Sequence, residues 1–254
     1  MRLAVFADVH GNSIALDAVL ADVDRQGVDG CVVLGDLAPI GADPAGVLER
    51  LKALPNARFV RGNGERYVVT GDRPTWFERD RSEAEVATTR LEMANSFSWT
   101  QGVVTARGWF DWLAALPFEL RFVLPDGTKV LAVHGTHRRD DEGTLTPTRS
   151  DDELHALVRD AGAELILAAH THRAMDRMLG ERLRIVNAGC VSNPLPDVED
   201  IRAGWALLDA RADGYSVTMR RVEYDHAAYV ESLRRVHHPA AAFIARLQRM
   251  PIHI

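Results

Sequence analysis

Two residue types that commonly bind metals, Asp8 and His10, follow an apolar run at the start of the chain, with one residue between them. Side chains alternate between the two faces of an extended segment, so both are expected to point the same way. Gly11 and Asn12 then turn the chain into a helix. A strand that ends in a carboxylate and an imidazole beside a helix N-terminus is typical of the edge where α/β proteins bind ligands.

Other apolar runs end in polar groups of the same kind. These groups are Asp36, Asn63, His134, His170 and His172. Taken singly, each has a simpler interpretation, as a turn or cap residue, an amide on a left-handed backbone, or a hydrogen-bonded core histidine. Parallel strands, however, bring their carboxyl ends to one edge of a sheet. So many polar groups at one edge would be costly to desolvate without a cation, so the sequence predicts a metal centre there.

Regular strands and helices must hold these groups in place. Short apolar runs predict strands at residues 3–7, 31–34, 58–61, 120–124, 129–133, 165–169, 184–186, 205–208 and 215–221. Capping residues and helical spacing predict helices at 13–26, 44–54, 83–94, 109–116 and 151–161, and further helices between about 224 and 250. The first 65 residues thus follow a β-α-β-α-β pattern, for which a right-handed parallel arrangement is expected. In the last helices, Val230, Leu233, Phe243 and Leu247 are expected to face inward.

A tryptophan-rich segment separates the two groups of predicted strands. Residues from about 70 to 117 contain Trp76, Trp99, Trp109 and Trp112 and no convincing strand. We interpret the segment as a helical insertion over one edge of the core. Amphipathic spacing explains its aromatic residues as packing rather than as ligand stacking. Because the chain has no internal repeat and no low-complexity linker, residues 1–254 are expected to form a single domain.

Composition narrows the classes of protein to consider. The chain has 46% hydrophobic and 26% charged residues and a net charge of −6, which indicates a globular protein without bulk attraction to nucleic acid or anionic membranes. Two cysteines, Cys31 and Cys190, make no disulfide framework. We find no signal-peptide pattern and no apolar run of membrane-spanning length, so we expect a cytoplasmic protein with a small-molecule substrate. The sequence leaves open whether it forms a homo-oligomer.

Taken in order, these residues resemble the calcineurin-like metallophosphoesterase superfamily. The pattern of that family is present as Asp8-Val9-His10, Gly35-Asp36, Gly62-Asn63-Gly64-Glu65, His134-Gly135 and Ala169-His170-Thr171-His172. The opening Asp-Val-His-Gly-Asn and the later Asn187-Ala188-Gly189-Cys190 resemble the bacterial single-domain phosphodiesterase branch. The resemblance spans about residues 1–210. It implies an α/β fold of two packed mixed β-sheets flanked by helices, with the site at the strand ends.

The resemblance also assigns the metal ligands. It implies two divalent metals bridged by Asp36. The first metal would also be bound by Asp8, His10 and His172, and the second by Asn63, His134 and His170. Mixed oxygen and nitrogen ligands suit Mn, Fe, Zn or Ni, among which we expect Mn first. In such a site a hydroxide that bridges the metals attacks phosphorus in line, so no protein nucleophile is needed.

Two positions depart from the family pattern. The residue after Asn63 is Gly64, where the family often has a histidine that protonates the leaving oxygen, and Ala169 replaces a glycine. A proton donor typically contributes about 10²–10⁴-fold to the rate, so its loss should affect poor leaving groups most. His137 is one candidate to supply the proton instead. The alternative interpretation of His137 is a loop histidine beside two arginines.

Hydrolysis of phosphoesters, most simply of phosphodiesters, is therefore the expected function. Asn12 and Arg173 are candidates for contact with the substrate phosphate, although Arg173 is equally well interpreted as a surface residue. A phosphomonoesterase or a nucleotide pyrophosphohydrolase would use the same centre. A non-catalytic protein-interaction scaffold of the same fold, as in retromer, has a degraded metal site. The complete set of predicted ligands here argues against that scaffold.

Overall fold

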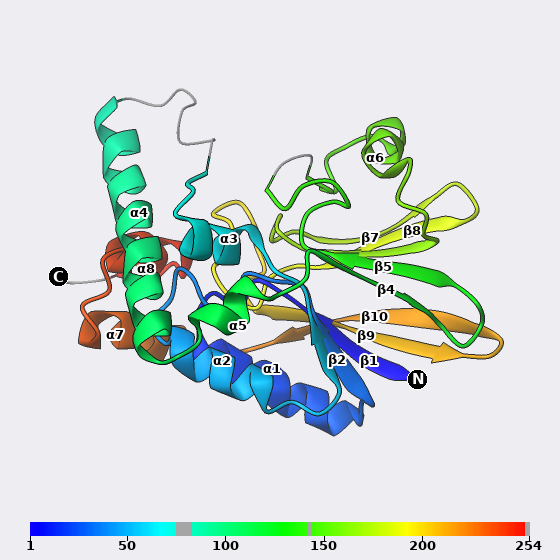
Figure 1. Cartoon of the computed structure of the whole chain (residues 1–254), viewed down its shortest axis with the longest axis horizontal. Coiled ribbons are helices and arrows are strands. Elements are labelled where there is room, and N and C mark those ends of the chain that lie inside the picture. Colours follow the sequence, from blue (N-terminus) through cyan, green and yellow to red (C-terminus); the bar gives the residue numbers. More distant parts are fainter. Residues whose placement is uncertain (75–82, 142–143, 252–254) are drawn as a thin grey trace.

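The structure, a computed structural model, describes residues 1–74, 83–141 and 144–251. Two five-stranded sheets lie face to face, with helices on their outer faces and at one end (Figure 1). This arrangement confirms the predicted α/β fold of two packed mixed sheets flanked by helices. None of the described helices is long and apolar enough to cross a membrane.

The first sheet is built around the opening strand of the chain. Across the sheet its strands are β10 (Gly214–Val222), β9 (Ala203–Arg211), β1 (Arg2–Phe6), β2 (Gly30–Val33) and β3 (Ala57–Phe59). β1, β2 and β3 are parallel, as the β-α-β-α-β pattern predicts, and β9 and β10 add an antiparallel hairpin beside β1. The carboxyl ends of the three parallel strands therefore share one edge, and Asp8, Asp36 and Asn63 follow them there.

The second sheet brings the histidines to the same edge. Across it lie β4 (Glu119–Val123), β5 (Lys129–Val133), β6 (Leu165–Ala168), β8 (Leu183–Ala188) and β7 (Ala174–Leu179). β5, β6 and β8 are parallel, while β4 and β7 pair antiparallel at the two edges. The hairpin predicted around residues 120–133 is present. β7 is not predicted from the sequence, because Asp176 and Arg177 interrupt its apolar pattern on an edge strand.

Eight helices are described around the sheets. They are α1 (Ser13–Gln26), α2 (Pro44–Lys52), α3 (Asn63–Thr70), α4 (Glu83–Ala106), α5 (Phe110–Ala114), α6 (Asp151–Val158), α7 (His226–Arg235) and α8 (Ala241–Leu247). Figure 1 shows α1 and α2 below the first sheet, α6 above the second, and the other helices gathered at one end. α3 is not predicted, and α4 extends well beyond the predicted residues 83–94.

The buried faces of the helices can be compared with the faces predicted from the sequence. Trp109 and Trp112 pack against the core, as the packing interpretation expects, and Trp99 lies edge-on to His238. The fourth tryptophan of the segment, Trp76, lies outside the described residues. The predicted Val230 and Leu233 of α7 are buried, and Phe243 of α8 is partly buried against the core. Leu247 is also only partly buried, whereas Ile244, which was not predicted, is fully buried at the centre of the inward face of α8.

Alternation along the strands divides the apolar side chains between separate cores. Leu3 and Val5 of β1 belong to the core between the sheets, where they meet Leu167 of β6. Ala4 and Phe6 belong to the core under α1 and α2. Because β1 is buried on both faces, its position is fixed on both sides. The residues that follow it are therefore held in a rigid frame.

Candidate metal centre

Most of the predicted ligands lie on left-handed backbone. The φ angle is 55° at Asp8, 49° at His10, 51° at Asp36, 69° at His170 and 54° at His172. Residues other than glycine adopt this conformation at a cost of about 1–2 kcal/mol each, and such strain concentrates at functional sites. Backbone hydrogen bonds between strand ends support it, from the Asp8 N–H to the Gly35 carbonyl (3.0 Å) and from the His10 N–H to the Asp36 carbonyl (2.9 Å).

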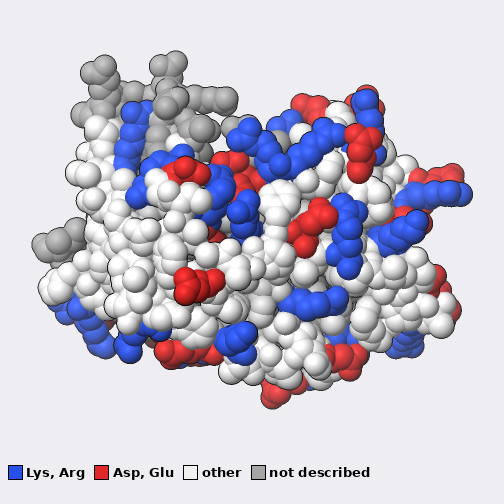
Figure 2. Space-filling view, viewed as in Figure 1, with Lys and Arg blue, Asp and Glu red and all other residues white. Residues whose placement is uncertain are grey.

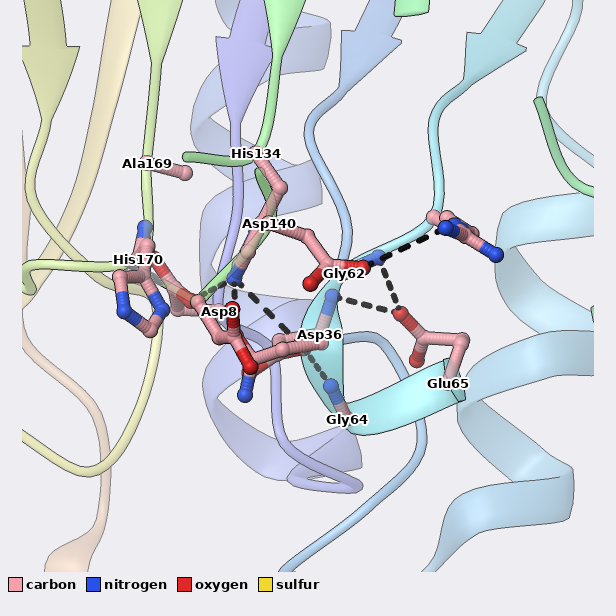
Figure 3. A network of polar contacts seen from close by, with 12 residues as sticks. Asp8, Asp36, Gly62, Gly64, Glu65, His134, Asp140, Ala169 and His170 are labelled. Atoms are coloured by element: carbon pink, nitrogen blue, oxygen red, sulfur yellow. Dashed lines mark hydrogen bonds and ion pairs between the residues drawn. The ribbon is translucent and has the colours of Figure 1, made fainter. Parts of the chain in front are cut away.

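Two buried carboxylates occupy the middle of the site. Oδ1 of Asp8 lies 3.4 Å from Nε2 of His172, 3.9 Å from Nε2 of His10 and 4.0 Å from Nε2 of His134. This oxygen is buried and has no hydrogen-bond partner in the described part of the chain. Asp36 directs Oδ1 to His134 (3.7 Å) and Oδ2 to His10 (3.9 Å). Figure 3 shows Asp8 and Asp36 facing His134 from below.

Backbone carbonyls fix the orientation of three imidazoles. The Nδ1 contacts are His10 to the Pro39 carbonyl (3.0 Å), His134 to the Leu34 carbonyl (2.6 Å) and His172 to the Asn193 carbonyl (2.6 Å). A carbonyl can only accept a hydrogen bond, so each Nδ1 carries a hydrogen. Each Nε2 is left to face the centre, which is the arrangement that histidine ligands of metals commonly show.

The rings of His10 and His172 come close enough together to favour a positive charge between them. Nε2 of His10 lies 3.1 Å from Nε2 of His172. Burial lowers the pKa of His10 to about 4, with a further contribution from His172. Burial also opposes protonation of His172, but the neighbouring Asp8 carboxylate outweighs it and raises the pKa of His172 well above its ordinary value. The cluster therefore attracts a cation to the point where its nitrogen and oxygen atoms converge.

The geometry of these atoms fits metal coordination. Ligand atoms that lie about 2.0–2.2 Å from one ion are roughly 3–4 Å from each other, depending on the angle between them. Asp8, His10 and His172 form one candidate group, and Asp8, Asp36 and His134 form a second. Asp8 is common to both groups, and Asp36 reaches His10 as well as His134. The donor set of each group therefore suits a divalent ion, and the two groups are adjacent because they share Asp8.

The two remaining predicted ligands flank His134. Asn63 begins α3, and its Oδ1 lies 2.9 Å from Nε2 of His134. His170 lies outside both groups, but its backbone N–H donates to Oδ2 of Asp8 (3.2 Å) and its ring centroid is 5.2 Å from that of His134. Burial lowers the pKa of His170 to about 4, so its ring is neutral at pH 7, as a metal ligand must be.

Glu65 has a supporting role that the sequence analysis did not assign. Its buried carboxylate accepts hydrogen bonds from the backbone N–H groups of Asp36 (2.8 Å), Leu37 (2.8 Å), Ala38 (3.3 Å) and Gly62 (2.8 Å). Figure 3 shows Glu65 on the far side of Asp36 from His134. Glu65 therefore joins the loop after β2 to the start of α3. The spacing Gly62-x-x-Glu65, with an acidic residue in the first helical turn, was the signal for it.

The position of the missing histidine is already filled by another side chain. A Cβ atom on Gly64 would lie 2.4 Å from Cγ of Pro39 and 2.8 Å from Oδ1 of Asp36. The Gly64 N–H also donates to Oδ1 of Asp36 at 2.7 Å. Gly64 therefore allows α3 to begin directly against a metal-facing carboxylate, and Pro39 takes the space of a side chain.

An ion-pair network joins the helix that carries Asn63 to the loop that follows His134. Arg66 of α3 donates to both oxygens of Asp140, with Nε 3.0 Å from Oδ2 and Nη2 2.8 Å from Oδ1. It also donates to Asp141 (2.6 Å), which accepts from the Tyr67 hydroxyl (3.0 Å). The network joins α3, which carries Asn63, to the loop that follows β5. Sequence gave no signal for it, because the partners are more than 70 residues apart.

The two predicted substrate contacts lie in different surroundings. Asn12 is fully buried, where its Oδ1 caps α1 through the Ala15 N–H (3.0 Å) and its Nδ2 donates to Ser192 Oγ (2.9 Å). Contact between Asn12 and substrate stays a prediction, and this engaged side chain does not favour it. Arg173 pairs with Asp197 and lines a cavity of which His172 is also a wall.

His137 lies among charged residues other than the predicted ligands. Burial, with Arg138 and Arg121, lowers its pKa. Both of its ring nitrogens are buried without a hydrogen-bond partner among the described residues. A histidine with a lowered pKa carries little proton at pH 7, so these surroundings do not favour its predicted role as the acid.

Comparison with known proteins identifies the family of this chain. Residues 1–213 match the family model of the calcineurin-like phosphoesterase superfamily domain. The protein MJ0912 of Methanocaldococcus jannaschii is 24% identical over 238 residues, which cover 88% of each chain. The metallophosphoesterase from Sphaerobacter thermophilus has a TM-score of 0.73 and 24% identity, over 97% of this chain and 98% of that one.

Two further solved structures share the fold. The hypothetical protein PH1004 from Pyrococcus horikoshii has a TM-score of 0.79 and 20% identity, over 96% of this chain and 97% of that one. Vps29 from Entamoeba histolytica, solved in complex with Zn²⁺, has a TM-score of 0.50 and 15% identity, over 89% of this chain and its own full length. The family model covers most of the sequence, including every predicted metal ligand. The chain belongs to the calcineurin-like phosphoesterase superfamily.

Proposed function

We propose that this protein is a phosphodiesterase that depends on two divalent metal ions. The observation that carries the proposal is the 3.1 Å approach of His10 Nε2 to His172 Nε2 beside the unpartnered Oδ1 of Asp8. Because each Nδ1 is turned to a backbone carbonyl, neither Nε2 carries a hydrogen when the two rings are neutral, and a cation bound between these nitrogens and the carboxylate oxygen would stabilise all three groups. The superfamily consists of phosphoesterases by description, which supports a hydrolase.

Some residues would bind the metal ions directly, and others keep those metal-binding residues in position. One ion position would be held by Asp8, His10 and His172, and the other by Asn63, His134 and His170. Asp36, with one oxygen toward each side, would fix the separation of the two positions. Divalent ions bound there would acidify a water molecule and stabilise negative charge on the phosphoryl oxygens. Glu65 keeps Asp36 in place through the backbone.

Donation of a proton to the leaving group is the step for which this chain has the fewest candidate residues. Gly64 has no side chain to donate a proton, and Pro39 occupies the adjoining space. Esters with good leaving groups, which need little protonation, should therefore react faster than alkyl esters. The preference for diesters over monoesters rests on the motifs shared with the phosphodiesterase branch.

Metal analysis combined with hydrolysis assays tests the proposal. After reconstitution with Mn²⁺ we expect about two ions per chain, and faster hydrolysis of bis(p-nitrophenyl) phosphate than of p-nitrophenyl phosphate. Asp8→Asn should lose metal and activity, while Asp24→Asn, on the exposed face of α1, serves as the matched control. Substoichiometric metal without turnover would refute the enzyme. A strong preference for the monoester would overturn only the diester part. Activity must be measured directly, since metal binding by itself does not establish it.

A further inference from the structure

A cavity lined by arginines adjoins the metal centre. Arg173, Arg202, Arg221, Asp200 and Gly189 line it, together with the predicted metal ligand His172, and we call it the arginine pocket. Its volume is about 250 Å³. A water molecule takes up roughly 30 Å³ in the liquid, so the arginine pocket has room for a group of several heavy atoms.

Arg221 is held in one orientation by the backbone around it. Its Nη1 donates to the Ala188 carbonyl (2.8 Å) and to the Arg220 carbonyl (3.1 Å). A Cβ atom on Gly204 would lie 2.3 Å from Nη1, and one on Gly189 would lie 3.3 Å from Nη2. Two glycines thus make the space in which the guanidinium group lies. In the described part of the chain Nη2 has no hydrogen-bond partner, so Arg221 presents a preoriented donor.

The charges around the arginine pocket favour an anionic ligand. Three guanidinium groups line it against one carboxylate, that of Asp200, to which Arg202 donates through Nε (2.9 Å) and Nη2 (2.8 Å). Arg173 pairs with Asp197, whose side chain is 66% exposed. Exposed ion pairs contribute little to stability, so Arg173 can exchange this partner for a ligand oxygen at small cost. Figure 2 shows basic and acidic side chains interspersed over the face that it presents.

The position of His172 connects the arginine pocket to the chemistry. One side of this residue is a wall of the pocket, while its Nε2 faces Asp8 and His10. A group bound in the pocket therefore lies next to a phosphoryl group bound at the metal centre. Planar guanidinium groups match phosphate oxygens with paired hydrogen bonds. We propose that the arginine pocket binds a second phosphate, so that the substrate is a phosphoester with another phosphate on the same molecule. This inference rests on the proposed function.

Non-hydrolysable ligands test the inference separately from turnover. Calorimetry on the Mn²⁺-loaded protein would compare alkane-α,ω-bisphosphonates of increasing chain length with the alkylphosphonates of the same length, at physiological ionic strength. We expect one chain length to bind roughly ten- to a hundredfold more tightly than its monophosphonate partner, the value of a few charge-assisted hydrogen bonds. Equal binding of the two ligands at every chain length would overturn the inference. An equal gain from a carboxylate in place of the second phosphonate would overturn the assignment to phosphate.

Variants of the arginine pocket predict effects of opposite sign. Arg221→Gln should remove most of the gain from the second phosphonate. Asp200→Asn should increase it, because it removes the negative charge that pairs with Arg202 and lies 3.7 Å from Nε of Arg221. Arg211→Gln, with a side chain that is 77% exposed at the end of β9, is the matched control and should change neither affinity. If Arg211→Gln also abolished the tighter binding of the bisphosphonate, the effect would be one of general charge, and the inference about the arginine pocket would be refuted. If the aryl esters are not hydrolysed but the bisphosphonate still prefers the pocket, the proposed function fails while the anion site stands.

Discussion

Any side chain at position 64 should destabilise the protein. This includes histidine, the residue that the family often has at this position. The added Cβ atom of Gly64→Ala would lie 2.4 Å from Cγ of Pro39 and 2.8 Å from Oδ1 of Asp36. Both distances are shorter than real Cβ contacts, and the proline ring cannot rotate away. Overpacking of this kind typically costs about 1–3 kcal/mol. For a chain of this length each kcal/mol lowers Tm by about 2–4 °C, so we expect Gly64→Ala to lower Tm by roughly 2–12 °C.

Metal binding should weaken along with stability. The same Cβ atom presses on Asp36, which accepts the Gly64 N–H bond and lies between His10 and His134. Loss of such support around a ligand usually lowers metal affinity about 10–100-fold. Thermal unfolding and Mn²⁺ titration measure the two effects. Gly64→His should show both losses and no gain in turnover on an alkyl phosphodiester.

Two comparisons make the result decisive. Gly102→Ala is the matched control, because Gly102 also lies in a helix but has open space at its Cβ position among the described residues. It should be neutral or stabilising by about 0.5–1 kcal/mol. In the double variant, Pro39→Ala removes the closest atom and should restore part of the stability lost in Gly64→Ala. The reasoning is refuted if Gly64→Ala is as stable as the wild type and binds Mn²⁺ equally well, or if Gly64→His is faster.

Three further variants test other parts of the structure. Glu65→Gln replaces two acceptor oxygens by one, so it should lower the free energy of unfolding by about 1–3 kcal/mol and weaken Mn²⁺ binding. Unfolding and Mn²⁺ titration measure the two effects, and unchanged values of both would show that Glu65 does not support the site. The hydrogen bond from Arg220 lowers the pKa of Asp22 from 3.8 to about 2, so Asp22→Asn should cost about 2 kcal/mol in urea unfolding at pH 7. Because the folded pKa is the lower one, this difference is present above pH 3.8 and should shrink as pH falls toward 2; a constant difference would contradict the argument. His137→Ala should leave the rate on an alkyl phosphodiester nearly unchanged, whereas a fall of about 10²–10⁴-fold would identify His137 as the acid.

Sequence patterns predict the fold well where one residue type controls the local structure. Asn12 and Gly27 mark the two ends of α1, and Asp43 followed by Pro44 marks the start of α2. Continuous apolar runs identify the buried parallel strands, because both faces of these strands are covered. β7 and α3 were missed. β7 is an edge strand with a mixed pattern, and α3 follows so closely on β3 that its glycines suggested only a turn.

The metal centre is predictable as a set of side chains but not as a geometry. The order of the motifs identifies the candidate ligand residues, yet the carbonyls of Leu34, Pro39 and Asn193 that orient the histidines carry no signal, since every residue has a carbonyl. The Arg66–Asp140 pair depends on which loops the fold brings together. The reach of Pro39 toward Gly64 is equally non-local. It explains, however, why glycine follows Asn63 in a motif where a larger residue is common.

The left-handed backbone at the ligands decides which substitutions are informative. Alanine at Asp8, His10, Asp36, His170 or His172 would keep a backbone strain of about 1–2 kcal/mol while removing the side chain that we propose as a metal ligand. Asparagine tolerates this conformation and glycine prefers it. A glycine variant at these positions should therefore be more stable without metal than the alanine variant at the same position. In an alanine scan, loss of stability could therefore be read as loss of metal coordination. Asparagine, which tolerates the left-handed backbone, is the replacement that separates the two effects.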